Sequence, residues 1–405
     1  MDAQRRRFIV LALAGPLVAA GAWVLRPLAR KARPASGGAG SVLEAAIAEV
    51  QAGRRSTPLI SPPTAHGDVT VTFLARSPGG QVPRIVSDVT GWGENADNNT
   101  FDFTIGRMTR VGPTDWYSLE TQVALRARIE YFVVYDQGDY RFDPHNPRRT
   151  QLRGGGPSSE FVTPGYLPPR EFADPPVVPA GQTTEGTVAS RALGGSRRVI
   201  VYAPPGYREG GDYPVAVFQD SFAVVHAGEA PRLLDHLIAR KAIEPIVAVF
   251  TESHRYGDTA DHADTAMLAF LTRELLTWMA SRYAVTRDAG RRAILGVSYS
   301  AKDAFDAAVN STGAFDRVGL VIPGRRLGLD EIAAVSGRPG HRLRVAILAG
   351  QYDHANIATA RSVRQTLAGA GHAVDYIEVP EGHSRATWRN HMGKVLVSLF
   401  GTRTK

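Results

Sequence analysis

The chain has 405 residues, of which 43% are hydrophobic, and carries a formal net charge of +8. This length exceeds the roughly 100 to 200 residues of a typical domain, so we expect more than one domain. Seven Arg and Lys residues and one Asp lie among the first 34 positions, which leaves only +2 on the other 371, too little for a nucleic-acid-binding surface. The chain has no cysteine, which excludes disulfides, thiolate metal ligands and cysteine nucleophiles.

Residues 1–40 are typical of an export signal or a membrane anchor. Three arginines, Arg5 to Arg7, run directly into an apolar stretch over residues 8–25, which resembles a twin-arginine signal. About 18 apolar residues can also just span a bilayer, so a membrane tether and the absence of cleavage stay open. In both cases we expect the folded part to be periplasmic or extracellular.

Strand patterns over residues 57–166 predict a small β-sandwich, preceded by a short helix over residues 41–56. Period-two segments are separated about every ten residues by Gly, Pro, Asn and Asp, which is the pattern of an all-β domain. Two roles are open for Trp92, Trp116 and Tyr117. They either form a platform that stacks on sugar rings or pack in the sandwich core or at the interdomain face. We favour the packing role because aromatic residues in strands are usually core.

A linker rich in proline, residues 167–186, leads to a second domain over residues 187–405. There, short apolar and β-rich segments alternate with amphipathic helices. This alternation predicts an α/β fold, a mostly parallel sheet with helices on both faces. Functional side chains are then expected beyond the carboxyl ends of the strands.

The segment "GVSYS", residues 296–300, is a candidate nucleophile turn. The apolar strand "RAILG" precedes it and the helical segment "AKDAFDAAV" follows it, so Ser298 lies between a strand and a helix. Such a sharp turn needs small residues two positions to either side, and Gly296 and Ser300 are both small. Taken alone, this short match also fits a serine in an ordinary turn.

A serine nucleophile needs a base and a carboxylate that orients the base. Asp353 follows the strand "RVAILAG" 55 residues after Ser298, and His383 follows the strand "AVDYIEVP" 30 residues later. The order Ser, Asp, His and the placement after successive strands are those of an α/β-hydrolase triad. His354 and His372 are the competing histidines, and His372 precedes its strand, so we expect it at the opposite edge of the sheet.

Several segments of the second domain resemble the esterase-D-like branch of the α/β-hydrolases, and especially the enterochelin (ferric enterobactin) esterase group. They are "RRVIVYAPPGY", "VFQDSF", "HRYGD", "GVSYSA", "LAGQYD" and "EGHSRATWR". In that group an early-set, immunoglobulin-like domain precedes the α/β-hydrolase fold, as the predicted sandwich does here. The resemblance implies that Ser298 is the nucleophile, Asp353 the acid and His383 the base, without a cofactor.

The resemblance also implies two further parts of the site. An oxyanion hole needs two donors, which are the backbone N–H of Tyr299 and one from Ser221 or Phe222. Arg255 and Asp258 match the family's R-x-x-E element near the substrate, with Asp in place of Glu. A surface ion pair is the alternative interpretation of that Arg and Asp.

Trp388 and Arg389 follow the Gly-His pair and are further candidates for substrate binding. The chain also departs from the family pattern. Ser221 and Ser300 stand where glycines are usual, and Ser384 replaces an acidic residue. A Cβ at such positions can narrow a pocket or displace a donor, and a shift near 1 Å can slow a reaction about 100-fold.

These observations predict a serine carboxylic ester hydrolase that works through an acyl-enzyme intermediate on a small-molecule or glycan ester. The resemblance implies a siderophore ester. A polysaccharide acyl esterase and an envelope acyltransferase use the same triad and stay open, as does a binding module without activity. We expect no nucleic-acid partner and no metal site, because the 11 histidines are scattered without helical i, i+4 pairing. The oligomeric state stays open.

Overall fold

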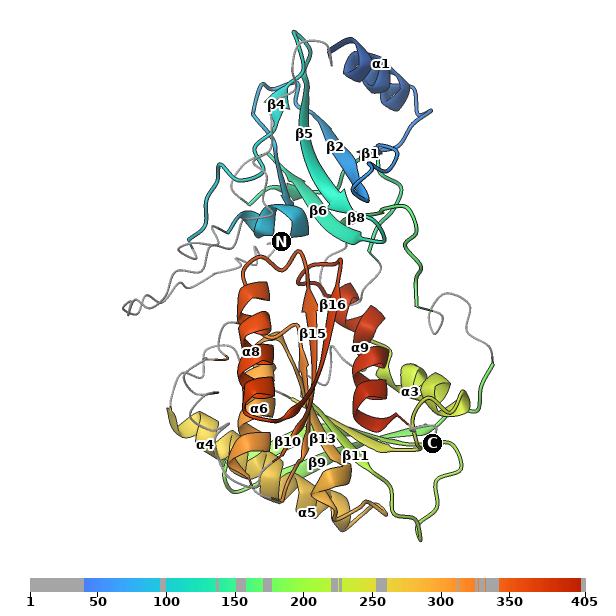
Figure 1. Ribbon diagram of the computed structural model, residues 1–405, viewed down its shortest axis with the longest axis vertical. Coiled ribbons are helices and arrows are strands. Elements are labelled where there is room, and N and C mark those ends of the chain that lie inside the picture. The colour runs from blue at the N-terminus through green and yellow to red at the C-terminus, as the bar shows by residue number, and fades with distance from the viewer. Residues whose placement is uncertain are drawn as a thin grey trace, which may run out of the picture.

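The computed structural model describes residues 40–94, 100–135, 138–150, 158–169, 177–219, 225, 228–252, 261–311, 313–324, 327, 332 and 342–401. In these residues two antiparallel β-sheets are followed by an eight-stranded sheet flanked by helices (Figure 1). The predicted export signal or anchor lies outside them except for its last residue. None of the helices in the described ranges combines the length and the apolar character needed to cross a bilayer.

The N-terminal region is a β-sandwich, as predicted. Its two sheets share one core, because side chains of both pack into a single apolar cluster. One sheet contains β1 (Leu59–Ile60), β2 (Asp68–Arg76), β5 (Trp116–Ala124) and β4 (Thr109–Arg110), and the other contains β3 (Arg84–Ser87), β6 (Arg128–Val134), β7 (Tyr140–Arg141) and β8 (Ser159–Val162). Helix α1 (Gly40–Gln51) packs its apolar side chains on the first of these sheets.

Aromatic side chains fill much of the sandwich core. Phe73 meets Tyr131 edge to face with ring centroids 5.0 Å apart, an arrangement that aromatic pairs favour. Trp116 and Tyr117 are also buried, with only 1% and 4% of their surface exposed. These two residues therefore belong to the core and offer no platform to a sugar, whereas Trp92 is half-buried.

A mostly parallel sheet of eight strands forms the second domain and confirms the predicted α/β fold. Its order is β16-β15-β14-β13-β11-β12-β10-β9, and only β10 runs antiparallel to the other strands described. The strands are β9 (Gln182–Ser190), β10 (Gly195–Ala203), β11 (Val215–Gln219), β12 (Val247–Thr251), β13 (Arg292–Val297), β14 (Arg317–Val321), β15 (Arg344–Gly350) and β16 (Ala373–Val379). Every residue of β11 and β12 is buried, as expected for strands covered on both faces.

Helices cover both faces of this sheet and divide its core into two apolar clusters. One face carries α4 (Asp261–Ala269), the π-helical turn η3 (Phe270–Glu274), α5 (Leu275–Ala280), α6 (Ala301–Asn310) and α8 (Ile357–Gly369). The other face carries α3 (Ala230–Ala239) and α9 (Arg385–Phe400) (Figure 1). A short 3-10 turn, η4 (Ala289–Arg291), precedes β13.

The sandwich lies over the carboxyl ends of β15 and β16 (Figure 1). The backbone N–H of Arg128 in β6 donates to the carbonyl of Pro380, just beyond β16, at 3.3 Å. Just beyond β15, the hydroxyl of Tyr352 accepts the N–H of Ala124 at 2.8 Å. The sandwich therefore contacts the segments that follow β15 and β16, where functional residues were expected.

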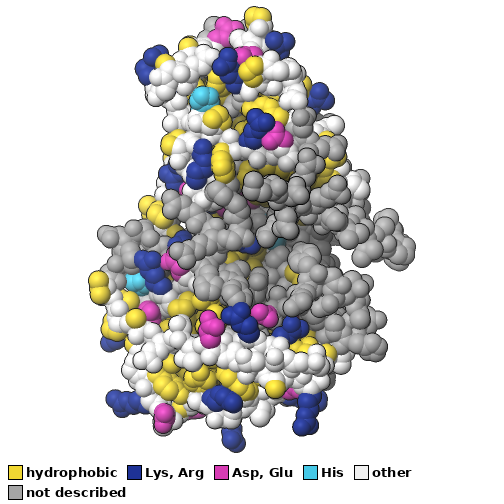
Figure 2. All heavy atoms as spheres, turned by 180° about the vertical axis from the view of Figure 1, so that it is seen from behind, with side chains coloured by type: hydrophobic (Ala, Val, Ile, Leu, Met, Phe, Trp, Pro, Cys, Tyr) yellow, Lys and Arg dark blue, Asp and Glu magenta, His cyan; other side chains and the backbone are white. Residues whose placement is uncertain are grey.

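Charged side chains are dispersed over one face of the described part of the molecule. On the face shown in Figure 2, the visible Lys and Arg side chains stand apart from one another, several of them beside Asp or Glu. Among the described residues, Arg291 pairs with Asp212 at 2.6 Å and Arg361 pairs with Glu378 at 2.7 Å. Such pairing is compatible with the nearly balanced charge of the chain beyond its first 34 residues.

Candidate active site

Ser298 occupies a strained turn at the end of β13. It begins the short helix η5 (Ser298–Ser300), and its φ of 52° is a left-handed conformation that residues other than glycine rarely adopt. This strain is typical of the turn that exposes the nucleophile in α/β-hydrolases. Gly296 is required beside it, because a Cβ there would lie 2.1 Å from the carbonyl oxygen of Ser300.

The serines that replace family residues at two positions stabilise the local backbone. The hydroxyl of Ser300 donates to the carbonyl of Val297 at 3.0 Å and accepts the Val297 N–H at 2.9 Å. Ser384 caps the first turn of α9, where its hydroxyl accepts the N–H of Thr387 at 3.2 Å. Both hydroxyls thus form hydrogen bonds with backbone groups of the turns in which they lie.

The three predicted triad residues meet in one line of hydrogen bonds. His383 Nε2 lies 2.8 Å from Ser298 Oγ, and His383 Nδ1 lies 2.7 Å from Asp353 Oδ2. Asp353 follows β15 and His383 follows β16, so the parallel sheet brings residues far apart in sequence to one edge. A hydroxyl, an imidazole and a carboxylate in this order can move a proton away from the serine.

Asn356 belongs to the same group, although the sequence analysis did not identify it. Its side-chain amide donates to Asp353 Oδ1 at 2.7 Å and lies 3.4 Å from His383 Nδ1. One carboxylate oxygen of Asp353 thus faces the imidazole while the other is held in place. The only sequence signal for Asn356 is its position three residues after Asp353, where α8 begins.

Both domains influence the protonation of His383. Burial lowers the pKa of the imidazole, but the hydrogen bond with Asp353 and the charges of Asp353, Asp88 and Glu94 raise it. The net pKa lies above the usual value for histidine. Because Asp88 and Glu94 come from the sandwich, the electrostatic environment of the site is not set by the second domain alone.

The two competing histidines have other surroundings. The Nδ1 of His372 accepts the N–H of Leu343 at 3.0 Å, at the edge where β15 and β16 begin, as expected for a residue that precedes its strand. His354 faces the sandwich. A Cβ added to Gly91 would lie 3.6 Å from the Cβ of His354. Burial lowers the pKa of His354. His383 is therefore the histidine that the structure brings to Ser298.

Four candidate residues, Ser221, Phe222, Arg255 and Asp258, lie outside the described residues. Tyr299 directly follows Ser298 in η5, which is the position that an oxyanion donor takes in this fold.

Two buried polar residues at the strand ends were missed by the sequence analysis. Gln219 ends β11, Thr251 ends β12, and the two are neighbours in the sheet. The side-chain amide of Gln219 and the hydroxyl of Thr251 are buried and have no hydrogen-bond partner among the described residues. Their signal in the sequence is a polar residue that closes an otherwise apolar strand.

The structure gives Trp388 and Arg389 other contacts. Trp388 is 4% exposed and packs in the core between α9 and the sheet, so little of its surface is left for a substrate. The guanidinium of Arg389 pairs with Glu229 at 3.0 Å and joins α9 to the start of α3. The burial of Trp388 therefore indicates a core residue and not a residue that contacts the substrate.

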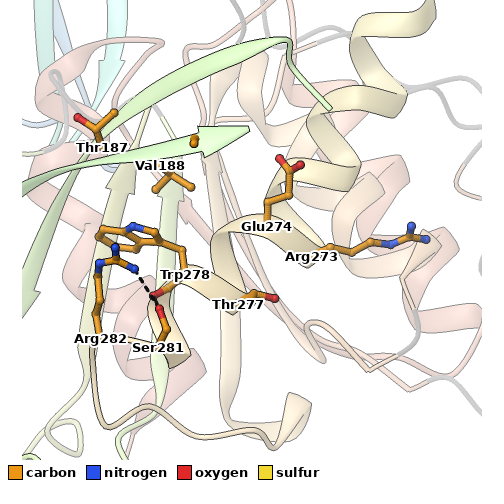
Figure 3. Close-up of a pocket in the computed structure, with 9 residues that line it drawn as sticks. Thr187, Val188, Arg273, Glu274, Thr277, Trp278, Ser281 and Arg282 are labelled. Atoms are coloured by element: carbon orange, nitrogen blue, oxygen red, sulfur yellow. Dashed lines mark hydrogen bonds between the residues drawn. The ribbon is translucent and has the colours of Figure 1, made fainter. Parts of the chain in front are cut away.

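A separate hollow of about 460 Å³ lies at the far edge of the sheet (Figure 3). It is lined by β9 and by residues 273–282, and Arg282 stacks over the ring of Trp278 at 4.7 Å. It contains none of the triad residues, so we do not assign the site to it. Among the described residues no cluster of three or more His, Asp or Glu side chains could hold a metal ion.

Comparisons with known proteins match both parts of the chain. The model of the Esterase family, described as "Putative esterase", matches residues 190–398, just over half of the chain. The ferric enterobactin esterase of Salmonella typhimurium is similar with a TM-score of 0.67 at 18% identity, over 87% of this chain and 98% of that one. The enterobactin esterase of Shigella flexneri, crystallised in the presence of enterobactin, has a TM-score of 0.64 at 18% identity, over 85% of this chain and 96% of that one. At this identity the two structures establish the fold.

Proposed function

The chain belongs to the esterase family, and we propose that Ser298, His383 and Asp353 are the nucleophile, base and acid of a serine carboxylic ester hydrolase. The observation that carries the proposal is the unbroken line of hydrogen bonds, 2.8 and 2.7 Å long, from the hydroxyl through the imidazole to the carboxylate. A serine attacks an ester only when a base takes its proton, and this line supplies the base. The positive φ of Ser298 supports the same role.

In the first half of the reaction, Ser298 Oγ attacks the ester carbonyl carbon while its proton passes to His383 Nε2. Nδ1 faces the Asp353 carboxylate and carries a proton, so Nε2 is free to accept one. Asp353 stabilises the imidazolium, and Asn356 fixes the orientation of that carboxylate. The imidazolium then protonates the leaving alkoxide, the alcohol departs, and the acyl group stays on Ser298.

In the second half, water takes the place of the alcohol. His383 removes a proton from the water, the hydroxide attacks the acyl carbonyl, and the proton returns to Ser298 Oγ as the acid leaves. Each tetrahedral intermediate carries a negative oxygen that needs donors. The backbone N–H of Tyr299 is the proposed first donor, and that of Ser221 or Phe222 the second.

The substrate class that we place first is a siderophore-type ester. The likeness to enterobactin esterases extends over 87% of this chain and so includes the sandwich as well as the parallel sheet, which supports this choice. An acyl ester on a polysaccharide, or acyl transfer to an alcohol of the envelope, would use the same triad. These alternatives are distinguished by the products.

A fluorophosphonate probe tests the nucleophile. We expect the probe to label Ser298 in the wild-type chain, and Ser298→Ala to abolish labelling and to lower kcat by roughly 10⁴-fold or more. Ser311→Ala, at the end of α6, is the matched serine control and should be labelled like the wild type. Labelling of a different residue, or hydrolysis that survives Ser298→Ala, would show that the triad assignment is wrong.

A panel of esters tests the substrate. Aryl acetates report the hydrolase itself, while enterobactin, feruloyl esters and acetylated polysaccharide report the substrate class. Release of linear products from enterobactin supports the siderophore proposal. Hydrolysis of aryl acetates with enterobactin left intact contradicts it, and acyl groups found on an added sugar or lipid acceptor indicate transfer in place of hydrolysis.

A further inference from the structure

A short helix of the sandwich, η1 (Asp88–Gly93), lies against the loop that carries His383. The carboxylate of Asp88 is packed on Gly382, because a Cβ added to that glycine would lie 1.9 Å from Asp88 Oδ1 and 2.1 Å from its Cγ. Asp88 itself is completely buried. A carboxylate of the first domain thus touches the residue directly before the proposed base.

Two elements of the sandwich fix this contact. Asp88 Oδ2 accepts the backbone N–H of Glu130 at 3.0 Å, and Asp88 Oδ1 accepts the indole N–H of Trp92 at 3.0 Å. Both partners donate, so each of the two hydrogen bonds is strongest when the carboxylate is ionised. Strand β6 also holds the loop through the hydrogen bond from the Arg128 N–H to the Pro380 carbonyl.

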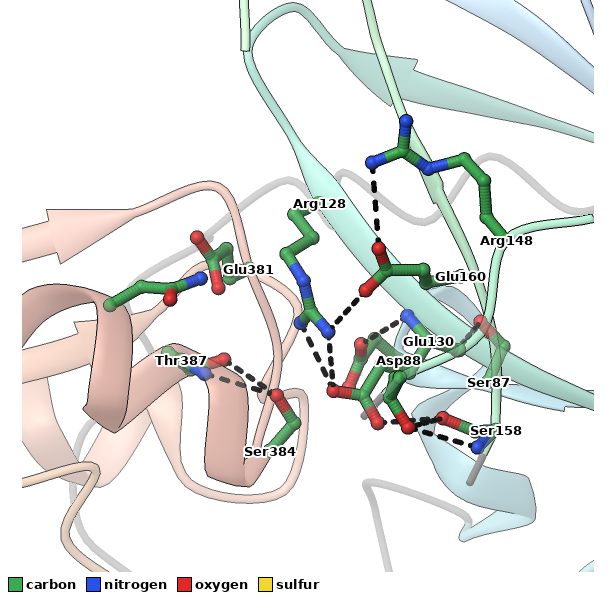
Figure 4. Close-up of polar contacts among 12 residues, drawn as sticks. Ser87, Asp88, Arg128, Glu130, Arg148, Ser158, Glu160, Glu381, Ser384 and Thr387 are labelled. Carbon is green, nitrogen blue, oxygen red and sulfur yellow. Dashed lines mark hydrogen bonds and ion pairs between the residues drawn. The ribbon is translucent and has the colours of Figure 1, made fainter. Parts of the chain in front are cut away.

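Several charged side chains, most of them buried, lie near Asp88 (Figure 4). Arg128 donates to Glu130 Oε1 at 3.0 Å and to Glu160 Oε2 at 2.6 Å. Glu381 lies across the domain boundary from Arg128, and one of its oxygens is 2.7 Å from His391 Nε2. We call Asp88, Arg128, Glu130, Glu160 and Glu381 the seam. The seam has one guanidinium among four carboxyl groups, and Arg148 pairs with Glu160 from outside it at 3.5 Å, so acidic groups remain in excess.

We propose that Asp88 is a positioning residue of the catalytic centre: the sandwich supplies a second carboxylate, which seats the His383 loop and adds negative charge near the imidazole. This inference rests on the proposed function, because it concerns the base that serves Ser298. Asp353 acts on His383 by a direct hydrogen bond, whereas Asp88 acts through Gly382 and through its charge. The centre is then complete only while the two domains are docked.

Charged groups from both domains act on His383 and on Asp88. Those that act on His383 are Asp353, which follows β15, and Asp88 and Glu94 from the sandwich. Those that act on Asp88 are Glu130 and Arg128 of β6. Two of the three groups that raise the pKa of the imidazole therefore come from the first domain.

Loss of this charge has a specific consequence. A nearby carboxylate stabilises the imidazolium that forms as the serine is deprotonated. Without the charge of Asp88, the pKa of His383 falls, so the free base persists to lower pH. The acid limb of the pH profile of kcat/KM then moves to lower pH, and kcat on the plateau falls because the imidazolium is less stable.

Asp88→Asn tests the inference, because it keeps the shape of the side chain and one of its two acceptor oxygens and removes the charge. The full chain hydrolyses an aryl acetate across the pH range, and the active fraction is counted by fluorophosphonate titration of Ser298. We expect the acid limb to move down by about half a pH unit or more and kcat to fall roughly three- to thirtyfold, with little change in KM. A merely structural role would lower the active fraction and leave the limb in place.

The control is Asp143→Asn, which removes another buried carboxylate of the sandwich, one that accepts the Tyr131 hydroxyl at 2.7 Å. It should leave the acid limb where the wild type has it. If Asp88→Asn titrates fully with the probe and its limb coincides with the wild type, the inference is overturned while the triad stands. If the wild type is not labelled at Ser298, the proposed function fails, and the inference fails with it.

A second variant covers the case in which Asp88→Asn does not fold. Trp92→Phe keeps an aromatic ring and removes the indole donor, so the pKa of Asp88 rises and less negative charge remains near His383. We expect a smaller shift of the limb in the same direction. An unchanged limb in this variant overturns the inference as well.

Discussion

The eight-stranded sheet and the seam are both buried, but they are built from opposite kinds of side chain. In β11 and β12 every residue is buried, and all except the last of each strand are apolar. In the seam, Asp88, Glu381 and Arg128 are only 0%, 1% and 5% exposed, yet all three can carry charge. Burial alone therefore does not distinguish the two regions, whereas the chemistry of what is buried does.

This contrast assigns the two regions different tasks. Apolar burial contributes about 25 cal/mol per Å² removed from water and has no directional requirement, so the sheet can provide most of the stability. Buried charges lose hydration that their ion pairs only partly restore, so the seam adds little net stability. Its hydrogen bonds are directional, however, and two of them hold the loop before His383 and the carboxylate that faces it.

Removal of a core side chain should affect stability and leave the chemistry intact. Leu396→Ala deletes a fully buried side chain of α9 and should lower the free energy of unfolding by about 3 kcal/mol, through lost burial and a cavity. Urea unfolding measures this loss. Val397→Ala, one residue later and 37% exposed, is the control and should cost well under about 1 kcal/mol. If Leu396→Ala moved the acid limb of the pH profile, the division of tasks would not hold.

Much of the α/β domain and its triad could be predicted from the sequence, because each functional residue follows a strand that is visible as a short apolar segment. Ser298, Asp353 and His383 each come within four residues of the end of such a segment, and parallel strands end at one edge. The spacing of apolar residues along α9 could also have shown that Trp388 is a core residue. Met392, Val395 and Leu396 follow it at helical spacing and share its buried face.

The seam could not be predicted in this way. Asp88 lies more than 200 residues before His383, in a different domain, and no local period links an acidic residue in a sandwich turn to a loop of the second sheet. Gly382 is a partial signal that the sequence analysis did not use, because a glycine directly before a histidine can mark a close approach. The sequence does not show which atom approaches, because docking of the two domains determines it.

A methyl group on Gly382, where that residue contacts Asp88 of the seam, should damage catalysis more than folding. In Gly382→Ala the new Cβ would lie 1.9 Å from Asp88 Oδ1, so the loop must move, and a shift near 1 Å at His383 should lower kcat by about 100-fold. Steady-state kinetics at the plateau pH measures this, alongside urea unfolding. Gly369→Ala at the end of α8, where a Cβ meets nothing within 4 Å, is the matched control. Equal activity in both variants would contradict close packing of Asp88 on the loop.

The smallest expected effect is on the pH dependence of stability. Burial, followed by the charge of Glu130, raises the pKa of Asp88 to about 7, whereas a free Asp titrates near 4. Between these values the folded chain holds a proton that the unfolded chain has lost, so the contribution to stability is fully present below about pH 4 and is lost as pH rises through about 7. Asp88→Asn removes this dependence.

Urea unfolding at mildly acidic and mildly alkaline pH measures the change. In the wild type, the free energy of unfolding should carry a decrease on the order of 1 to 2 kcal/mol from Asp88 as pH rises, and Asp88→Asn should lack that part. If the free energy of unfolding depended on pH identically in both proteins, the pKa of Asp88 would not be raised in the folded chain. Asp88→Asn can lose this pH dependence of stability and also show a moved acid limb of kcat/KM. The carboxylate of Asp88 then acts on stability and on catalysis, because its ionisation destabilises the seam and favours protonation of His383.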